Sequence, residues 1–271
     1  MAPIGKESDL LSLVAKSKGL IGLAIVLAIV LIVTAASVLA PYDPTQSSLF
    51  FLAPPSAEHW MGTDDLGRDT FSRLLHGGRS SLIVGIGAAI IAALIGVPTG
   101  LAAGYVGGKV DLVASPVIDL FIALPGLVLA LIITAMVGPT LINLVLVLGF
   151  VSWPRVARLT RGQALAIRES VFVEAARAVG AGPAWIIHAH IWPNTARIVA
   201  AQFALTVAYS IFTSASLSFL GLGVQPPTPD WGAMVRTGFD YLAINPSMSL
   251  GPSAAVALTV FGFYLVGTSI E

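Results

Sequence analysis

The sequence contains no cysteine and few charged residues. Without cysteine the chain can form no disulfide bond, no thiolate metal site and no cysteine nucleophile. Charged residues make up 10% of the 271 positions, whereas a soluble domain carries roughly 25%. Hydrophobic residues make up 56%, and the mean hydropathy is +0.90. This balance indicates a protein that lies mostly within a membrane.

The chain also lacks the short motifs of several enzyme classes. It has no phosphate-binding loop, because Val110 follows Gly108-Lys109 and Ala103 stands where the loop's first glycine belongs. No GxSxG elbow, HExxH pair or catalytic triad is present. The four histidines lie outside the apolar runs, which disfavours an intramembrane hydrolase, and the one close pair has a spacing that does not suit a metal on a helix. We therefore expect no catalytic residue, no metal site and no cofactor in this chain.

Six apolar runs are long enough to cross a membrane, which takes roughly 20 residues of helix. Backbone groups must be paired within each span, and the alternation of barrel strands is absent, so the fold class we predict is all-α. The first run could end in a signal-peptide cleavage site at Val38-Leu39-Ala40, but its length favours a retained span. The expected spans are Leu20–Ala40, Ser81–Val106, Leu112–Val137, Leu141–Leu159, Ile198–Leu220 and Leu250–Ile270.

The distribution of basic residues predicts how these spans are oriented. Ten of the fourteen Lys and Arg residues lie before the first span, between the second and third spans, and around the loop between the fourth and fifth spans. Six spans put all three of these segments on one side of the membrane. The opposite loops carry four Arg against seven acids. The positive-inside rule therefore places both termini in the cytoplasm.

This topology divides the chain into a cytosolic N-terminal segment, 1–17, and a transmembrane domain, 18–271. The N-terminal segment contains a small amphipathic piece, Asp9–Val14, which we expect at the cytosolic membrane surface. The second and third spans are rich in Gly and Ala, so we expect them to face other helices, with kinks at Pro98 and Pro125.

Two external segments are expected, at 41–79 and 221–249. The first ends in a short amphipathic helix, Thr70–His76, which Gly77-Gly78 is expected to terminate. The second is rich in proline and reads as a rigid loop whose Trp231 and Tyr241 could sit at the membrane surface.

A polar insert at 160–195 interrupts the apolar runs. Glu169–Val179 is expected to form a helix that Gly180 ends, and a second helix starts at Gly182-Pro183. Two alanines leave a shallow face that can press into a partner's groove, while an amphipathic hairpin resting on lipid headgroups is the open alternative. The apolar anchors of the first interpretation are Phe172, Val179, Trp185 and Ile186.

The insert resembles the EAA loop of permease subunits of ATP-binding-cassette (ABC) importers. That pattern is EAA, three residues, a glycine, and a proline thirteen residues after the glycine. His190 and Trp192 replace the usual Ile and Leu before the proline, and Trp192 is a mild departure that affects local packing. The matching residues are Glu174, Ala175, Ala176, Gly180 and Pro193.

The external segment is similar to the GTDxLGRDxxSR signature of the second permease subunit in the dipeptide, oligopeptide and nickel branch of these importers. The similarity runs from about Ala40 to Tyr241, while the basic tail that family members usually carry is not seen before Glu271. The signature residues are Gly62, Thr63, Asp64, Leu66, Gly67, Arg68, Asp69 and Arg73, and further similar motifs are Arg79–Leu82, Ala123–Pro125 and Leu217–Gly223.

The resemblance implies a permease subunit of a prokaryotic plasma (inner) membrane that moves peptides into the cytoplasm by alternating access. It implies a heterodimer with a second permease subunit, two cytosolic P-loop ATPases that hold ATP and Mg²⁺, a solute-binding protein outside the cytoplasm, and no nucleic-acid partner. Nickel chelates or oligosaccharides are the alternative cargo. The residues implied to couple the chain to the ATPases are Phe172, Glu174, Ala175, Ala176, Val179, Gly180 and Pro193.

A transporter or channel that works without ATP is the rival interpretation. Such proteins usually hold ionisable groups or broken helices at the membrane midplane. Asp119 is the only clear acid within a span, which argues against this class. We expect Asp119 and Pro125 to serve a gate or the structure rather than to bind cargo.

Overall fold

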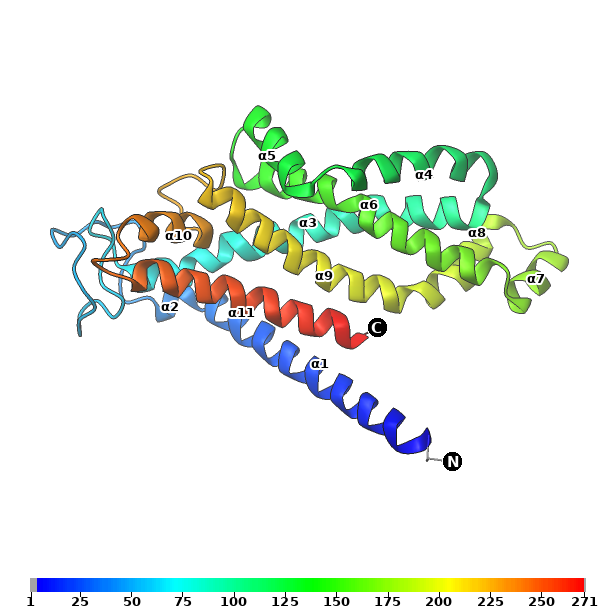
Figure 1. The fold of residues 1–271 in the computed structure, drawn as a ribbon, viewed down its shortest axis with the longest axis horizontal. Helices are drawn as coiled ribbons and strands as arrows, with labels where there is room; N and C mark the ends of the chain where they lie inside the picture. Colours follow the sequence, from blue (N-terminus) through cyan, green and yellow to red (C-terminus); the bar gives the residue numbers. More distant parts are fainter. Residues whose placement is uncertain (1–3, 271) are drawn as a thin grey trace.

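The computed structural model describes residues 4–270, with side chains from Ser17 onward. Over that range the chain forms helices and two isolated bridges but no extended strand, which confirms the all-α prediction. The long helices run along a common axis, with α7 at one end and α10 at the other (Figure 1). The helices are α1 (Ile4–Thr34), α2 (Ala36–Leu39), α3 (Thr70–Val106), α4 (Gly108–Ala123), α5 (Gly126–Val137), α6 (Leu141–Arg168), α7 (Val171–Ala178), α8 (Pro183–Ile186), the π-helix η1 (Ile187–Ile191), α9 (Trp192–Phe219), α10 (Trp231–Asp240) and α11 (Ser247–Ile270).

Five of the described helical segments are long and apolar enough to cross a membrane, and α4 with α5 make a sixth if they count as one span. These two helices are bent by 89° at the break between them. Leu124 is extended, as the residue before a proline tends to be, and α5 starts directly after Pro125. The third expected span is therefore broken at Pro125, whereas Pro98 lies inside α3 without ending it.

The separate helix expected at Thr70–His76 is wrong, because α3 continues through Gly77-Gly78. These glycines serve close packing instead of termination. A Cβ on Gly78 would lie 2.3 Å from Val33 Cγ2 and 2.7 Å from Trp231 Cζ2. The first turns of α3 thus belong to the segment expected to be external.

A row of glycines on α3 allows close contact with α6. A Cβ on Gly96, Gly100 or Gly104 would lie 2.5–2.7 Å from a backbone carbonyl oxygen of α6. Their four-residue spacing puts them on one helix face, where small residues let two backbones approach. The expected burial of the Gly- and Ala-rich spans is confirmed for α3, while α4 and α5 leave most of their side chains exposed or half-buried.

The second external segment contains a helix, α10, where we expected only a rigid loop. Trp231 begins this helix and is buried, so its expected position at the membrane surface is wrong. Its Nε1 donates a hydrogen bond to the Leu74 carbonyl oxygen at 2.8 Å. Trp231 packs in a cluster with Val33, Leu82, Ala89, Val207, Ile211 and Met234.

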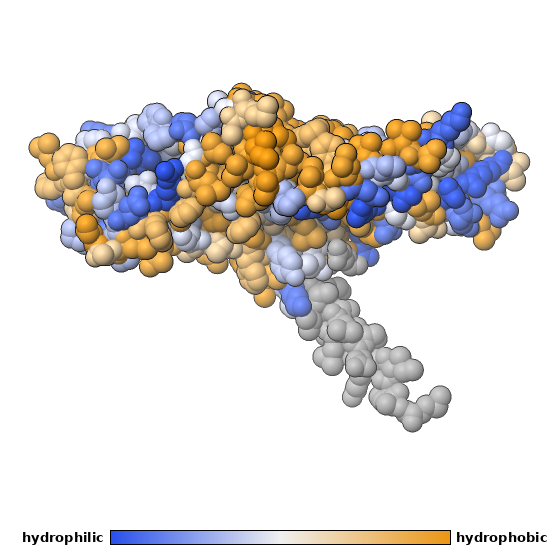
Figure 2. Space-filling view, turned by 45° about the horizontal axis from the view of Figure 1, so that its top comes forward, coloured by the Kyte–Doolittle hydropathy of each residue, from blue (hydrophilic) through white to orange (hydrophobic). Residues whose placement is uncertain are grey.

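The N-terminal segment is continuous with the first span, because α1 runs from Ile4 to Thr34 without a break. The side chains of the expected amphipathic piece, Asp9–Val14, lie outside the described residues. The start of α1 and the end of α11 both point toward the end of the bundle that carries α7 (Figure 1). On the face that Figure 2 shows, hydrophobic side chains cover the middle of the molecule, and hydrophilic ones gather on either side of it.

Candidate functional site

The candidate coupling surface lies on α7, a helix that is slightly shorter than the sequence predicted. The helix spans Val171–Ala178 rather than Glu169–Val179. Gly180 has φ +83°, and a Cβ there would meet no atom within 4 Å, so glycine is required for its backbone conformation and not for space. Pro183 opens α8, as expected. Pro193 lies in the first turn of α9, and α8, η1 and α9 follow one another without a gap.

The inner face of α7 packs into the membrane-spanning bundle. Val173 and Ala176, three residues apart, are both buried. Ile186 is fully buried too, so its expected role as an exposed anchor for a partner is wrong. The cluster that holds this face combines residues of α3, α6, α8 and η1, namely Leu101, Tyr105, Ala164, Ile186 and Ile191. The buried face of α7 therefore contacts α3 and α6 as well as the two elements that follow it in the chain.

Arg177 provides a second connection from α7 to the bundle. Its Nε donates to the Tyr105 hydroxyl at 3.4 Å, and its Nη2 donates to the Arg168 carbonyl oxygen at 3.2 Å. The guanidinium also lies 5.3 Å from the centre of the Tyr105 ring. In the sequence Arg177 is one of the basic residues near the loop between the fourth and fifth spans, and nothing there indicates its partner 72 positions away.

The outer face of α7 forms a shallow groove of about 570 Å³. Glu174 beside it is exposed and makes no ion pair with another described residue. The ring of His190 lies 5.8 Å from that of Phe172 and 5.1 Å from that of Trp185, so His190 helps to shape the groove. The groove is lined by Phe172, Ala175, Ala176, Val179, Gly180, Ala181, Trp185 and His190. Five of the seven residues that the resemblance implied for coupling line it, whereas Glu174 and Pro193 do not.

The signature segment lies at the opposite end of the bundle (Figure 1). Its centre is Asp64, whose Oδ1 accepts the backbone N–H groups of Leu66 and Arg68, both at 2.9 Å. Oδ2 accepts Arg68 Nε at 2.7 Å and lies 3.4 Å from Arg73 Nε. All three charged side chains are buried. Buried charges need such pairing, because removal of one partner leaves the other uncompensated.

The rest of the signature completes the local fold. Asp69 caps α3, with Oδ2 accepting the Ser72 N–H at 2.7 Å, and its Oδ1 lies 2.8 Å from His59 Nδ1. Thr63 is fully buried and its hydroxyl accepts the Ala53 N–H at 2.9 Å. Gly62 and Gly67 both have φ +72°. These contacts give the signature a structural role at this end of the molecule.

The acid in the third expected span, Asp119, pairs with Arg158 of α6. Both side chains are more than half exposed. A second pair, which the sequence did not reveal, joins α4 to α6 through Asp111 Oδ1 and Arg161 Nε at 2.5 Å. The two pairs hold α4 along α6 on one side of the break at Pro125, which supports a structural account of Asp119.

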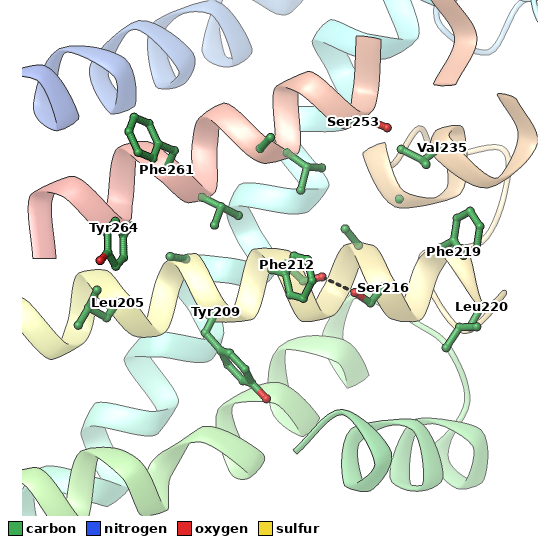
Figure 3. Close-up of a pocket in the computed structure, with 16 residues that line it drawn as sticks. Leu205, Tyr209, Phe212, Ser216, Phe219, Leu220, Val235, Ser253, Phe261 and Tyr264 are labelled. Atoms are coloured by element: carbon green, nitrogen blue, oxygen red, sulfur yellow. Dashed lines mark hydrogen bonds between the residues drawn. The ribbon is translucent and has the colours of Figure 1, made fainter. Parts of the chain in front are cut away.

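An apolar groove of about 930 Å³ lies between α9, α10 and α11. Figure 3 shows Phe212, Phe219, Phe261 and Tyr264 among its lining side chains, while Tyr209 points from α9 toward the green helices. No group of three or more His, Cys, Asp or Glu side chains able to hold a metal occurs among the described residues.

Similarity to known proteins shows the family of this chain. The family of binding-protein-dependent transport system inner membrane components matches residues 96–271. The chain belongs to this family. The permease is 41% identical over 217 residues to a glutathione transport system permease protein of Pectobacterium atrosepticum, with 80% of this chain and 72% of the relative covered. A probable D,D-dipeptide transport system permease protein of Escherichia coli is 39% identical over 234 residues, with 86% and 78% covered.

The fold of the permease is similar to that of a solved ABC transporter. The MetNI methionine ABC transporter in an inward-facing form matches with a TM-score of 0.61 and 19% identity, over 72% of this chain and 93% of that chain. At this identity the likeness shows the fold alone. Together with the family, it confirms a membrane permease subunit of an ABC importer, a class that works with ATPase and substrate-binding partners.

Proposed function

We propose that this permease carries peptides into the cytoplasm as one half of a heterodimeric pathway. The cargo is supported by two relatives whose names give glutathione and a D,D-dipeptide as the transported molecules. Nickel chelates and oligosaccharides remain the alternative cargo. Both ends of the chain and α7 face the cytoplasm in this proposal, in agreement with the positive-inside rule. The start of α1 and the end of α11 point toward the end of the bundle that carries α7, as this orientation requires (Figure 1).

The observation that carries the proposal is the two-faced character of α7. Its outer groove is exposed and apolar, and its inner face is packed against four other elements. A cytosolic ATPase seated in the groove would move α7 when it binds ATP, and the buried cluster would pass that movement to the spans. The chain itself would catalyse no reaction and bind no cofactor, since ATP and Mg²⁺ would be held by two separate ATPase subunits. A solute-binding protein would deliver cargo at the opposite end, near the signature segment.

Two exposed valines at the ends of α7 test the coupling. Val179 lines the groove and is 85% exposed, whereas Val171 lies outside the groove and is 81% exposed. Burial of a carboxylate in an apolar contact is costly, so we expect Val179→Glu to lower ATPase co-purification by about tenfold or more. Val171→Glu, with the same change in charge, should leave it near the wild-type level. Equal effects of the two variants would contradict coupling through this groove.

The cargo is tested with the complete transporter in proteoliposomes. ATP-driven uptake of a labelled dipeptide, a nickel chelate and an oligosaccharide should be compared in the presence of the cognate binding protein. We expect uptake of the dipeptide alone. Uptake without ATP, or of another cargo only, would overturn the proposed function.

A further inference from the structure

The break in the third span places a helix N-terminus beside an arginine in the middle of the bundle. Arg155 of α6 is exposed, and its guanidinium lies 4.1 Å from the centre of the Tyr209 ring of α9. Gly126 begins α5 at the same place. A Cβ on Gly126 would lie 2.6 Å from the Tyr209 hydroxyl and 3.5 Å from Arg155 Nη2. Two segments that attract negative charge therefore meet here, because the first N–H groups of a helix have no partner within it.

Arg155 differs from its neighbours in having no acid beside it. Arg158 and Arg161, further along α6, each pair with an acid of α4. Arg155 makes no ion pair with any acid in the part of the chain that the structure describes. It stands 14 residues after the start of α6, about 21 Å along a helix, while the hydrocarbon core is about 30 Å thick. An unpaired charge at such depth is expensive and is usually functional.

The same place holds a small cavity of about 200 Å³ between α6 and α9. Ser152, one of its lining residues, is buried to 2% exposure, and its hydroxyl has no hydrogen-bond partner among the described residues. Tyr209 points out of the apolar groove toward the green helices (Figure 3). Five of the six lining residues are polar, and the full set is Ser152, Arg155, Gln202, Leu205, Thr206 and Tyr209.

We propose that Arg155, the first turn of α5 and the Ser152 and Tyr209 hydroxyls form an anion subsite that receives a carboxylate of the cargo as it crosses the membrane. Guanidinium groups and hydroxyls are the donors that carboxylates accept, and half-helix N-termini at membrane depth serve anionic groups in other transporters. A linear peptide with a free C-terminus presents such a carboxylate, so the proposal rests on the proposed peptide cargo. The subsite is specific for charge and not for side chains, as a pathway for varied peptides requires.

Direct binding tests the subsite separately from transport. Saturation-transfer NMR on the complete transporter, without its binding protein, should show contact with alanyl-alanine and much weaker contact with its C-terminal amide. We expect Arg155→Gln to weaken alanyl-alanine binding by about tenfold or more. Arg155→Lys should retain most of the binding, because it keeps the charge. Arg197→Gln is the matched control, since Arg197 lies on α9 outside the cavity and donates only to the Ile270 carbonyl oxygen among the described residues.

The possible results are distinct. Equal binding of the acid and the amide, or binding unchanged in Arg155→Gln, would overturn the subsite. Loss of the second permease subunit from the purified Arg155→Gln transporter would also overturn it, and would make Arg155 a contact between subunits. If the wild type binds alanyl-alanine through Arg155 but does not transport it, the subsite stands and the peptide cargo is wrong.

Discussion

Asp230 is a carboxyl group that the fold buries while using it to cap a helix. It is 1% exposed, and its Oδ2 accepts the Ala233 N–H at 3.0 Å at the start of α10. Burial raises the pKa of Asp230 above its ordinary value of 3.8, although the hydrogen bonds that it accepts act in the opposite direction. The folded protein therefore binds this proton more readily than the unfolded protein does.

The sign of the pH dependence follows from this difference. An acid with a raised pKa in the fold contributes most stability at low pH, and this contribution is lost as the pH rises from 3.8 to the raised value. Asp230→Asn cannot ionise and still caps the helix, so it should flatten this slope without lowering the apparent Tm at neutral pH. Asp230→Ala should cost about 1 kcal/mol through loss of the cap. Thermal unfolding in detergent between about pH 4 and pH 7 measures both, and a steeper slope in Asp230→Asn would contradict the argument.

Single glycines show how far the structural role of a residue can be predicted from the sequence. Gly180 was expected to end a helix, and it does so with a positive φ. Gly77 and Gly78 were expected to end a helix as well, but α3 runs through them, and at Gly78 the missing Cβ leaves room for Val33 and Trp231. A glycine can be needed for its backbone conformation or for the close approach of another segment, and the sequence does not distinguish these two reasons. Only the distant partner distinguishes them.

At the scale of elements, the contact between α3 and α6 is set by the glycine row. A Cβ on Gly100 would lie 2.5 Å from the Ala157 carbonyl oxygen, whereas a Cβ on Gly162 of α6 would meet no atom within 4 Å. Gly100→Ala should therefore destabilise the folded chain by about 1–3 kcal/mol. Gly162→Ala should stabilise it by roughly 0.5–1 kcal/mol, because alanine favours a helix. The apparent Tm of the two variants measures the difference, and equal shifts would show that the row does not set the contact.

The broken span shows why the course of a membrane span was harder to predict than the number of spans. Hydropathy located every spanning segment, and Pro125 marked the point of irregularity. The two helices on either side of this point are bent by 89°, and α4 is joined to α6 by the Asp119–Arg158 and Asp111–Arg161 pairs. The second pair joins residues 50 positions apart. A count of charges does not show which acid pairs with which arginine. It therefore could not reveal that Arg158 and Arg161 pair with acids of α4 while Arg155 lines a cavity instead.

At the scale of the whole molecule, patterns that depend on local composition were predictable and contacts between segments were not. The EAA spacing led to the groove on α7, because a glycine, an alanine pair and their apolar neighbours lie within one short stretch. The buried face of the same helix was not anticipated, since Val173 and Ala176 acquire their partners from α3 and α6. The exposed half of the site was thus predictable, and the half that would transmit movement was not.

The orientation of the whole molecule is testable because the chain has no cysteine. Ala57 of the external segment and Ala184 of α8 are both exposed at opposite ends of the bundle. With α7 in the cytoplasm, a membrane-impermeant maleimide should label Ala57→Cys in spheroplasts and Ala184→Cys only after permeabilisation. The unmodified chain is the control, since it offers no thiol. Labelling of Ala184→Cys in sealed spheroplasts would put the groove on α7 outside the cell, where no cytosolic ATPase could reach it, and would overturn the proposed coupling together with the orientation.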